Sequence, residues 1–554
     1  MAEATRCARV LVEALVTAGV RDVVLAPGSR SAPLAYELFE ADRIGLLTLH
    51  VRIDERSAGF LATGLVRGSG LPVPVVTTSG TAAANLHPAV LEAWHSHLPL
   101  VVLTADRPRS LVHTGANQTT DQEHLFGRHV RAFAGLSDAG GDVAGWRFEA
   151  LRLLSAATGV RSRLPGPVHL NVALTEPLVP TAVAPVPAAP EVRVSAVGPG
   201  QPTVLPAGPQ TVVVAGDLPP AAGRDAAALA ASAGVPLLAE PSSNARRGPT
   251  ALSTYRLLLA SGLAEEIERV VLVGRPTLSR PVSRLLARTD VELVVVTPYA
   301  EWPDPGRVAS TVTDAVVFAG ADPGAGAGGV AGLDPEWCDA WREADRSARK
   351  QLDALLAAQP YLSGPALAAA LWSVLGPEDA LVVGSSNSVR DLDLAPVAAD
   401  PAEVYALRGL AGIDGTVATA VGVALTRDRP THALLGDLTM LHDAGALVIG
   451  PDEPRPDLRL VLANDDGGSI FATLEQGEPA HLSAFERVFA TPHRADFAAL
   501  AAVTGTCHRR VHELAELAEV LAEPPVGLEL VEAVVDRGQR RTLNEAVNAI
   551  AATL

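Results

Sequence analysis

The stretch THALLGDLTMLHDAGALVIGPDEPRPDLRLVLANDDGGSIF, residues 431–471, decides the fold of this chain. Its first segment, THALLGD, is an apolar run typical of a buried strand and ends at Gly436-Asp437. LTMLHDAGALV has the apolar spacing of a helix, and LRLVLAND is a second apolar strand. The pattern predicts a parallel strand–helix–strand unit, whose strands end at the sheet edge where open α/β folds bind ligands.

Oxygen-bearing side chains follow both predicted strands. Asp437 ends the first strand, and Asp465 and Asp466 end the second, directly before Gly467-Gly468. Carboxylates at neighbouring strand ends suit Mg²⁺, and glycines let a backbone approach a diphosphate closely. Taken singly, each motif could equally be a strand-end turn or a surface hairpin. As a pair they predict a metal–diphosphate site.

Length and composition narrow the class of protein. A chain of 554 residues with 48% hydrophobic content predicts several domains with packed cores. The net charge of −18 argues against nucleic acid or an anionic membrane surface as a partner, since phosphate binding needs a basic face. Three scattered cysteines indicate a reducing cytoplasm rather than a disulfide framework. The N-terminus lacks signal-peptide features, and no apolar run is long enough to span a membrane.

Apolar strands alternate with helical stretches in three regions, which predicts an α/β protein with mainly parallel sheets flanked by helices. We assign residues 1–180, 209–350 and 351–554 to three domains. Residues 181–208 contain PTAVAPVPAAPEVRVSAVGPGQP, which has no periodicity, and are interpreted as a linker.

The first region carries further candidate residues at predicted strand ends. Ser29 and Arg30 lie in a turn after an apolar strand, although a solvated turn explains Arg30 equally well. Glu55 begins a predicted helix, where a glutamate more often complements the helix dipole than serves a site. A later strand, VPVVTT, leads into a helix expected to be capped by Ser79 or Thr81.

Two short motifs are set aside. Gly324, Gly326 and Gly329 match G-x-G-x-x-G but follow no clean strand, so a loop is expected rather than a dinucleotide site. Ser347 and Lys350 match S-x-x-K within a charged helix that we expect to be solvated.

The paired motifs resemble the diphosphate and metal motif of thiamine-diphosphate-dependent enzymes, in which GDG is followed by NN. Leu438 in place of the last glycine points within that family to the 2-succinyl-5-enolpyruvyl-6-hydroxy-3-cyclohexene-1-carboxylate synthases of menaquinone biosynthesis, the MenD family. Asp465 in place of the second asparagine is a departure that leaves the preferred ion open. PGSRSAPL, RIDERSAGF, TSGTAAANL, ADRP, GANQT, RGLAGIDG and NDDGGSIF also resemble this family.

The resemblance implies a pyrimidine-binding first domain, a central domain, and a diphosphate-binding third domain. It implies catalytic roles for Glu55, Arg107 and Gln118, and metal ligation by Asp437, Asp465 and Gly467. The cofactor-binding residues that it implies are Glu55, Ser79, Gly80, Ile413, Gly436, Asp437, Leu438, Asp465 and Ile470. The substrate-binding residues that it implies are Ser29, Arg30, Arg107, Gln118, Arg280, Ser386, Arg390, Arg408, Ile470, Phe471 and Leu474.

The resemblance further implies a transferase that uses thiamine diphosphate and Mg²⁺, with Mn²⁺ as an alternative. The expected reaction decarboxylates 2-oxoglutarate and adds the succinyl unit to isochorismate. The expected assembly is a homodimer or homotetramer with active sites at the subunit interface. Another thiamine-diphosphate carboligase, such as acetohydroxyacid synthase, and an α/β protein that has lost catalysis are the alternatives.

Overall fold

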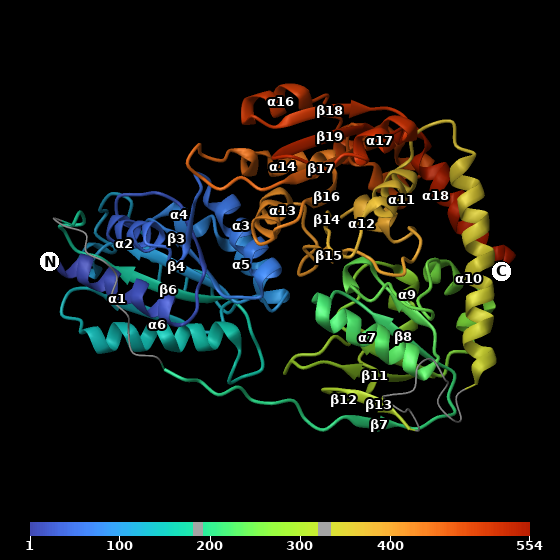
Figure 1. The fold of residues 1–554 in the computed structure, drawn as a ribbon, viewed down its shortest axis with the longest axis horizontal. Coiled ribbons are helices and arrows are strands. Elements are labelled where there is room, and N and C mark those ends of the chain that lie inside the picture. The colour runs from blue at the N-terminus through green and yellow to red at the C-terminus, as the bar shows by residue number, and fades with distance from the viewer. Residues whose placement is uncertain (181–191, 320–333) are drawn as a thin grey trace. The chain divides into compact units, whose positions relative to one another are not determined.

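The computed structural model describes residues 1–180, 192–319 and 334–554 (Figure 1). It contains two six-stranded sheets, one five-stranded sheet and one two-stranded sheet, and the pairings are mainly parallel. The fold class predicted from the sequence is therefore confirmed. The dismissed glycine motif at Gly324, Gly326 and Gly329 lies outside the described residues.

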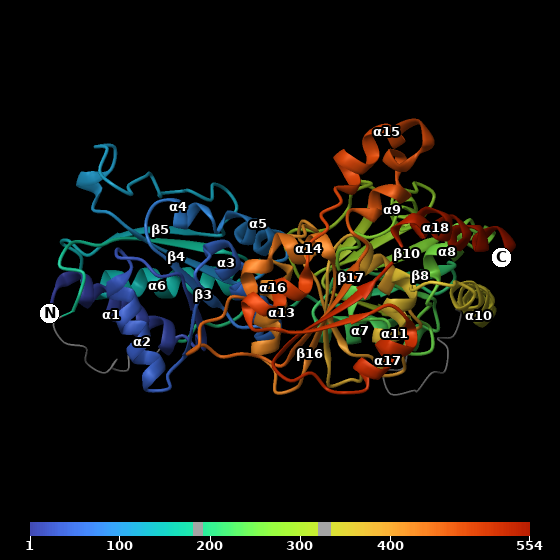
Figure 2. The same cartoon turned by 90° about the horizontal axis from the view of Figure 1, so that it is seen from above.

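The first sheet has the strand order β2-β1-β3-β4-β6-β5. Its strands are β1 (Asp22–Leu25), β2 (Thr48–Val51), β3 (Val73–Thr77), β4 (Leu100–Asp106), β5 (Phe133–Ser137) and β6 (Val168–Ala173). The accompanying helices are α1 (Glu3–Thr17), α2 (Ala32–Arg43), α3 (Glu55–Ser69), α4 (Thr81–Ala84), α5 (His87–His95) and α6 (Val143–Thr158). Apolar residues of α1, α2 and α6 share one core with this sheet, and α6 runs alongside β4 and β5 (Figure 2).

The second sheet has the order β12-β11-β10-β8-β9. Its strands are β8 (Thr211–Ala215), β9 (Leu237–Ala239), β10 (Arg269–Val273), β11 (Glu292–Val296) and β12 (Ala309–Thr313). Helices α7 (Pro220–Ala233), α8 (Tyr255–Leu258), α9 (Arg280–Leu285) and α10 (Pro335–Ala357) belong to this region. A separate pair joins β7 (Thr203–Leu205) to β13 (Val316–Phe318), so a strand forms inside the stretch interpreted as a linker.

The third sheet repeats the topology of the first, with the order β15-β14-β16-β17-β19-β18. Its strands are β14 (Ala380–Val383), β15 (Glu403–Tyr405), β16 (Thr431–Gly436), β17 (Leu458–Asn464), β18 (Cys507–Val511) and β19 (Leu528–Val534). The helices are α11 (Gly364–Val374), α12 (Asn387–Leu392), α13 (Thr416–Leu425), α14 (Asp437–His442), α15 (Leu482–Phe485), α16 (Phe497–Thr504), α17 (Leu514–Leu521) and α18 (Arg540–Ala549). The two strands of the deciding stretch, β16 and β17, are neighbours.

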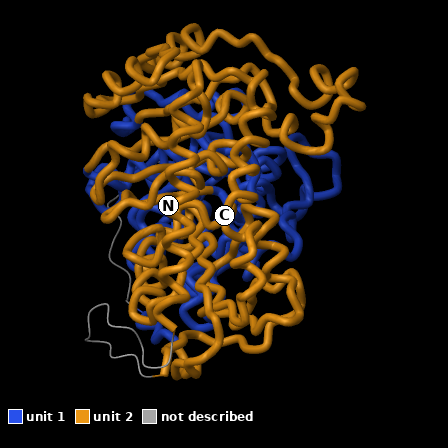
Figure 3. Tube along the Cα trace, turned by 90° about the vertical axis from the view of Figure 1, so that its right-hand side faces the viewer, with its two compact units in different colours: residues 1–197, 407–428, 441–458 blue, residues 198–406, 429–440, 459–554 orange. Residues whose placement is uncertain are grey.

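The chain divides into two compact units (Figure 3). Unit 1 holds residues 1–197, 407–428 and 441–458, and unit 2 holds residues 198–406, 429–440 and 459–554. The sequence region assigned to the third domain thus contributes to both units.

Helix α13 packs closely on α3 within unit 1. A Cβ atom on Gly64 would lie 2.3 Å from the carbonyl oxygen of Thr419, and one on Gly422 would lie 2.4 Å from that of Leu61. The two helices pack this closely because only glycine lets their backbones approach this far.

Two helices, the one after β16 and α10, can be compared directly with what the sequence predicts. The helix expected between β16 and β17 is a short α14 followed by a separate 3₁₀ turn at Ala444–Leu447, because Asp443, with φ −125° and ψ 23°, leaves the helical conformation. Ser347 and Lys350 are exposed on α10, so the solvated helix expected there is confirmed.

Within the described ranges, every helix is too short or too polar to cross a lipid bilayer.

Candidate active site

Asp437 joins the ends of two neighbouring strands. It follows β16 directly and is only 2% exposed, which excludes a solvated turn. Its Oδ2 accepts the backbone N–H groups of Gly467 at 2.9 Å and Asp465 at 3.2 Å, both beyond β17. Its Oδ1 accepts the N–H of Leu438 at 2.6 Å. The predicted adjacency of the two strand ends is confirmed.

Asp437 and Asp465 form a pair of carboxylates suited to a cation. Burial, and then the negative charge of Asp437, raises the pKa of Asp465 to about 7, and burial also raises the pKa of Asp437. A cation beside both carboxylates would offset the free-energy cost of holding two buried negative charges close together. Across the described ranges no group of three or more His, Cys, Asp or Glu side chains could hold a metal ion. An ion here would therefore need backbone, water or phosphate oxygens as well, which fits Mg²⁺ held together with a diphosphate.

Two glycines shape the space beside these carboxylates. Gly467 has a φ of +142°, and a Cβ there would lie 2.1 Å from the carbonyl oxygen of Ala490. Gly436 differs, because the nearest atom to a Cβ there is the Thr439 Oγ1, at 4.0 Å. Gly467 is thus required by the fold, whereas the open space at Gly436 suits the close approach of a ligand.

His493 is a site residue that sequence reasoning missed. Its Nδ1 accepts the backbone N–H of Ala495 at 2.9 Å, which assigns the proton of the neutral ring to Nε2. Nε2 lies 3.2 Å from the Oδ2 of Asp437. No local signal marks His493 in the sequence, since it lies in an irregular loop far along the chain from Asp437.

Asp466, the second acid of the NDDGG motif, holds that same loop. Its Oδ1 accepts the backbone N–H groups of His493 at 3.1 Å and Arg494 at 2.8 Å. These hydrogen bonds hold the pKa of Asp466 below its usual range. Of the two adjacent acids, Asp465 faces Asp437 and Asp466 organises the loop.

Glu55 lies in the first turn of α3, within unit 1. The helix cap is Asp54, whose side chain accepts the N–H groups of Arg56 and Ser57. Capping therefore does not explain Glu55, whose Oε2 accepts a hydrogen bond from the Asn85 Nδ2 at 3.2 Å. Its carboxylate is half-buried and retains further acceptor capacity.

Asp443 ties the start of α3 to the start of α13. Its Oδ2 accepts the N–H of Ala418 at 2.8 Å, and its Oδ1 accepts the hydroxyl of Ser57 at 3.4 Å. The carboxyl is fully buried, and this burial raises its pKa to about 6. Glu55 and Ile413, which precedes α13, are thus held on elements that share one buried anchor.

Ser79 and Gln118 are joined by two hydrogen bonds, each from one side chain to the backbone carbonyl oxygen of the other residue. The Ser79 hydroxyl donates to the carbonyl oxygen of Gln118, and the Gln118 Nε2 donates to the carbonyl oxygen of Ser79, both at 3.0 Å. The expectation that Ser79 or Thr81 caps the next helix is wrong. Gly80 occupies the cap position of α4 with a φ of +86°, and no side chain caps it.

A network of buried polar side chains binds the backbone at Gly80. The Gln122 Oε1 accepts the N–H of Gly80 at 2.8 Å, and its Nε2 donates to the Asn171 Oδ1 at 3.0 Å. The Asn171 Nδ2 donates to the Asp106 Oδ2 at 2.8 Å, and the Asp106 Oδ1 accepts the N–H of Arg107 at 2.7 Å. Gly80 and Arg107 are therefore positioned by one hydrogen-bonded network in unit 1.

Arg30 and Arg107, both in unit 1, lie close enough for their positive charges to affect each other. Arg30 is 5% exposed, so it is not a solvated turn residue, and it donates to the carbonyl oxygen of Leu174 at 2.8 Å. Burial, and then the positive charge of Arg107, lowers the pKa of Arg30. The Nε atoms of both arginines have no hydrogen-bond partner among the described residues. Ser29, beside Arg30, is exposed. This pair suits an anionic ligand.

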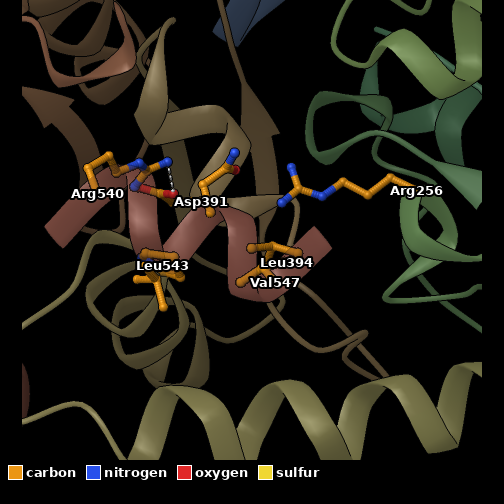
Figure 4. A pocket seen from close by; sticks show the side chains of 8 residues that line it. Arg256, Asp391, Leu394, Arg540, Leu543 and Val547 are labelled. Carbon is orange, nitrogen blue, oxygen red and sulfur yellow. Dashed lines mark hydrogen bonds and ion pairs between the residues drawn. The ribbon is translucent and has the colours of Figure 1, made fainter. Parts of the chain in front are cut away.

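Helix α12 and the residue before it contain two of the candidate residues in unit 2. Ser386 precedes it with a φ of +69°, and the Arg390 Nη1 donates to the carbonyl oxygen of Ser386 at 2.7 Å. The next residue, Asp391, pairs with the two Nη atoms of Arg540 on α18 at 2.7 and 2.9 Å (Figure 4). These groups border a water-sized cavity of about 10 Å³, which Arg256 approaches from the other side (Figure 4). The ion pair fixes the helix that presents Arg390.

Arg280 binds a carboxylate of the chain itself. Its two Nη atoms lie 3.0 and 3.4 Å from the carboxylate oxygens of Glu475, and both side chains are exposed. The two side chains thus form a surface ion pair. Ile470, Phe471 and Leu474 are half-buried in the same loop region.

The candidate residues are distributed over both units. Unit 1 contains Ser29, Arg30, Glu55, Ser79, Gly80, Arg107, Gln118, Arg408 and Ile413. Unit 2 contains Arg280, Ser386, Arg390, Gly436, Asp437, Leu438, Asp465, Gly467, Ile470, Phe471 and Leu474.

Comparison with known proteins identifies the family. Residues 5–125 match the thiamine pyrophosphate enzyme, N-terminal TPP binding domain. A 2-succinyl-5-enolpyruvyl-6-hydroxy-3-cyclohexene-1-carboxylate synthase from Nocardioides sp. (strain ATCC BAA-499 / JS614) is 52% identical, over 99% of this chain and 98% of its own. The chain belongs to this synthase family. A second member, from Mycobacterium avium (strain 104), is 42% identical over 99% of this chain and all of its own.

Membership of the synthase family confirms the resemblance seen in the sequence, and with it an enzyme of the thiamine-diphosphate class. A solved structure, the benzoylformate decarboxylase from Polynucleobacter necessarius, has a TM-score of 0.67 over 97% of this chain and 99% of its own. At 17% identity it shows a shared fold only. This chain and that decarboxylase thus share one fold over nearly their whole lengths.

Proposed function

We propose that this enzyme decarboxylates 2-oxoglutarate and transfers the succinyl unit to isochorismate. The products are 2-succinyl-5-enolpyruvyl-6-hydroxy-3-cyclohexene-1-carboxylate and carbon dioxide, in menaquinone biosynthesis. The observation that carries this proposal is the 52% identity to a synthase of that name along 99% of the chain. The paired arginines of unit 1 support it, because both proposed substrates carry two carboxylates.

Asp437, Asp465 and the backbone of Gly467 would hold Mg²⁺, or Mn²⁺ in its place, together with the cofactor diphosphate. The buried, mutually repelling carboxylates support this assignment. Thiamine diphosphate, when bound, supplies the electron sink that decarboxylation of a 2-oxo acid requires. The other proposed cofactor contacts are Ser79, Gly80, Ile413, Gly436, Leu438 and Ile470.

Glu55 would hydrogen-bond a pyrimidine ring nitrogen of the cofactor and hold a proton there. The free acceptor capacity of its half-buried carboxylate supports this role. We propose a homodimer as the smallest active assembly, or a homotetramer built from it, acting in the cytoplasm. In such a dimer each active site takes Glu55 from one subunit and the metal-binding aspartates from the other.

The substrate-binding residues divide into two proposed groups. Ser29, Arg30, Arg107 and Gln118, with Arg280, would hold isochorismate and orient its ring. Arg107 and Gln118 would contact the reacting part of that ring. Ser386, Arg390 and Arg408 would hold the carboxylate that derives from 2-oxoglutarate, and Ile470, Phe471 and Leu474 would exclude water with an apolar wall.

The test is consumption of isochorismate, followed by its near-ultraviolet absorbance, with 2-oxoglutarate, thiamine diphosphate and Mg²⁺ present. We expect absorbance loss that requires every component and disappears in Glu55→Gln. Release of carbon dioxide from another 2-oxo acid, without loss of isochorismate, would overturn the substrate assignment and leave only the cofactor class.

A further inference from the structure

The carboxylate of Glu92, on α5, accepts hydrogen bonds from the backbone of the loop that contains Arg408. Its Oε1 accepts the N–H of Gly409 and its Oε2 accepts the N–H of Leu410, both at 2.8 Å. Glu92 is 4% exposed and lies more than 300 residues before this loop in the sequence, in the same compact unit. Hydrogen bonds from two consecutive N–H groups to one carboxylate are strong and directional.

The carboxylate of Glu92 is itself held in place. The Ser96 hydroxyl donates to Oε1 at 2.9 Å, and the Arg67 Nη2 donates to Oε1 at 3.3 Å. Arg67 also donates to the Ser96 hydroxyl, at 3.0 Å. The arrangement therefore fixes the carboxylate before it contacts the loop, and the charge of Arg67 compensates its burial.

Gly409 is required for this contact. A Cβ at Gly409 would lie 2.6 Å from both the carbonyl oxygen and the Oε2 of Glu92. Any larger residue would push the loop away from α5 or displace the carboxylate. The loop and the glutamate are matched to each other.

We propose that Glu92 is the positioning residue for Arg408. The N–H of Gly409 belongs to the same planar peptide unit as the carbonyl group of Arg408, so fixing it restrains the backbone from which the Arg408 side chain extends. Arg408 is 3% exposed. The inference rests on the proposed function, in which Arg408 binds the carboxylate derived from 2-oxoglutarate, and it assigns the precision of that contact to Glu92.

The segment that contains Glu92 also contacts Glu55, the proposed cofactor-binding glutamate of unit 1. Asn85, which contacts Glu55 at 3.2 Å, lies between α4 and α5, and Glu92 lies in α5. One short segment thus supports both Glu55 and the backbone beside Arg408. A change at Glu92 alone leaves the Asn85 contact in place, which allows the two effects to be separated.

The test compares Glu92→Gln with the unaltered enzyme and with Glu149→Gln, a control that removes a helix-surface ion pair to Arg152. In Glu92→Gln the amide group opposes one backbone N–H, so the loop is released. We expect the KM for 2-oxoglutarate to rise about tenfold, with the Kd for thiamine diphosphate in Mg²⁺ changed less than twofold. The control should match the unaltered enzyme.

Gly409→Ala provides an independent test with Glu92 intact. We expect the same rise in KM for 2-oxoglutarate, because the added methyl group displaces the carboxylate. An unchanged KM in both variants would overturn the proposal. So would a parallel loss of cofactor affinity and thermal stability, which would make Glu92 a purely structural tie.

Hydrogen exchange distinguishes failure of this inference from failure of the proposed function. The amides of Gly409 and Leu410 should exchange at least tenfold faster in Glu92→Gln, while those inside α13 remain protected. Lack of 2-oxoglutarate turnover by the unaltered enzyme would overturn the proposed function. Unchanged exchange at the two amides would overturn the role of Glu92 whatever the substrate.

Discussion

The carboxylate of Asp437 accepts the backbone N–H of Gly467 at 2.9 Å. A single side chain therefore sets the spacing between the end of β16 and the loop after β17, and the same side chain is the proposed metal ligand. Cofactor binding and loop geometry are coupled at this residue.

We expect Asp437→Asn to weaken thiamine diphosphate binding in Mg²⁺ by at least 100-fold, measured by calorimetry. The amide carries one acceptor oxygen where the carboxylate serves Gly467, Asp465 and Leu438 from both oxygens, and it lacks the charge that binds the ion. Asp452→Asn, at an exposed position, is the matched control. Unchanged affinity in Asp437→Asn would refute the metal assignment.

The two glycines beside the carboxylates should respond differently to alanine. Gly467→Ala should lower stability by about 2–3 kcal/mol, because its φ of +142° and the contact with Ala490 exclude a Cβ. Gly436→Ala should keep the melting temperature, because the space there is open, but weaken thiamine diphosphate binding. Thermal denaturation with and without cofactor separates the two effects. Equal behaviour of the two variants would contradict the assignment of Gly436 to the cofactor site.

Asp443 should make unit 1 less stable as the pH rises. Its folded pKa of about 6 lies above the ordinary aspartate pKa of 3.8, so the folded protein binds the proton more tightly than the unfolded chain. The stabilisation is complete below about pH 4 and is lost as the pH rises through about 6, by roughly 3 kcal/mol. In Asp443→Asn this part of the decline should disappear when unfolding is followed between pH 4 and 7. Identical pH profiles would rule out the buried carboxyl as the cause.

Glu475 should compete with substrate for Arg280. Since Glu475 contacts both Nη atoms of Arg280, an incoming carboxylate must displace it. We expect Glu475→Gln to lower the KM for isochorismate severalfold without changing the melting temperature, because the pair is exposed. Glu478→Gln, in the same loop, controls for the loss of charge. A raised KM would show that Glu475 assists binding, and an unchanged KM would remove Arg280 from the substrate site.

The sequence predicted the strands and their ends better than the roles of single side chains at those ends. Asp437 and Asp465 could be paired in advance because both directly follow apolar runs of a parallel unit. The cap of α4 was predicted wrongly, because Ser79 and Thr81 have cap chemistry but Gly80 takes the cap position and Ser79 bonds to Gln118. Local propensity was overridden there by a tertiary contact.

The sequence by itself determined the three larger sheets and the adjacent ends of β16 and β17, because hydrophobic periodicity and strand-end residues are local features. Its motifs also carried the resemblance to the family. Only the tertiary structure decided that Glu92 holds Gly409, that Gln122 meets Asn171, and that the Nε2 of His493 lies 3.2 Å from the Oδ2 of Asp437. The physical reason is that a buried hydrogen bond needs only complementary groups in space. It imposes no spacing along the chain, so residues more than 300 positions apart can form it without leaving a pattern in the sequence.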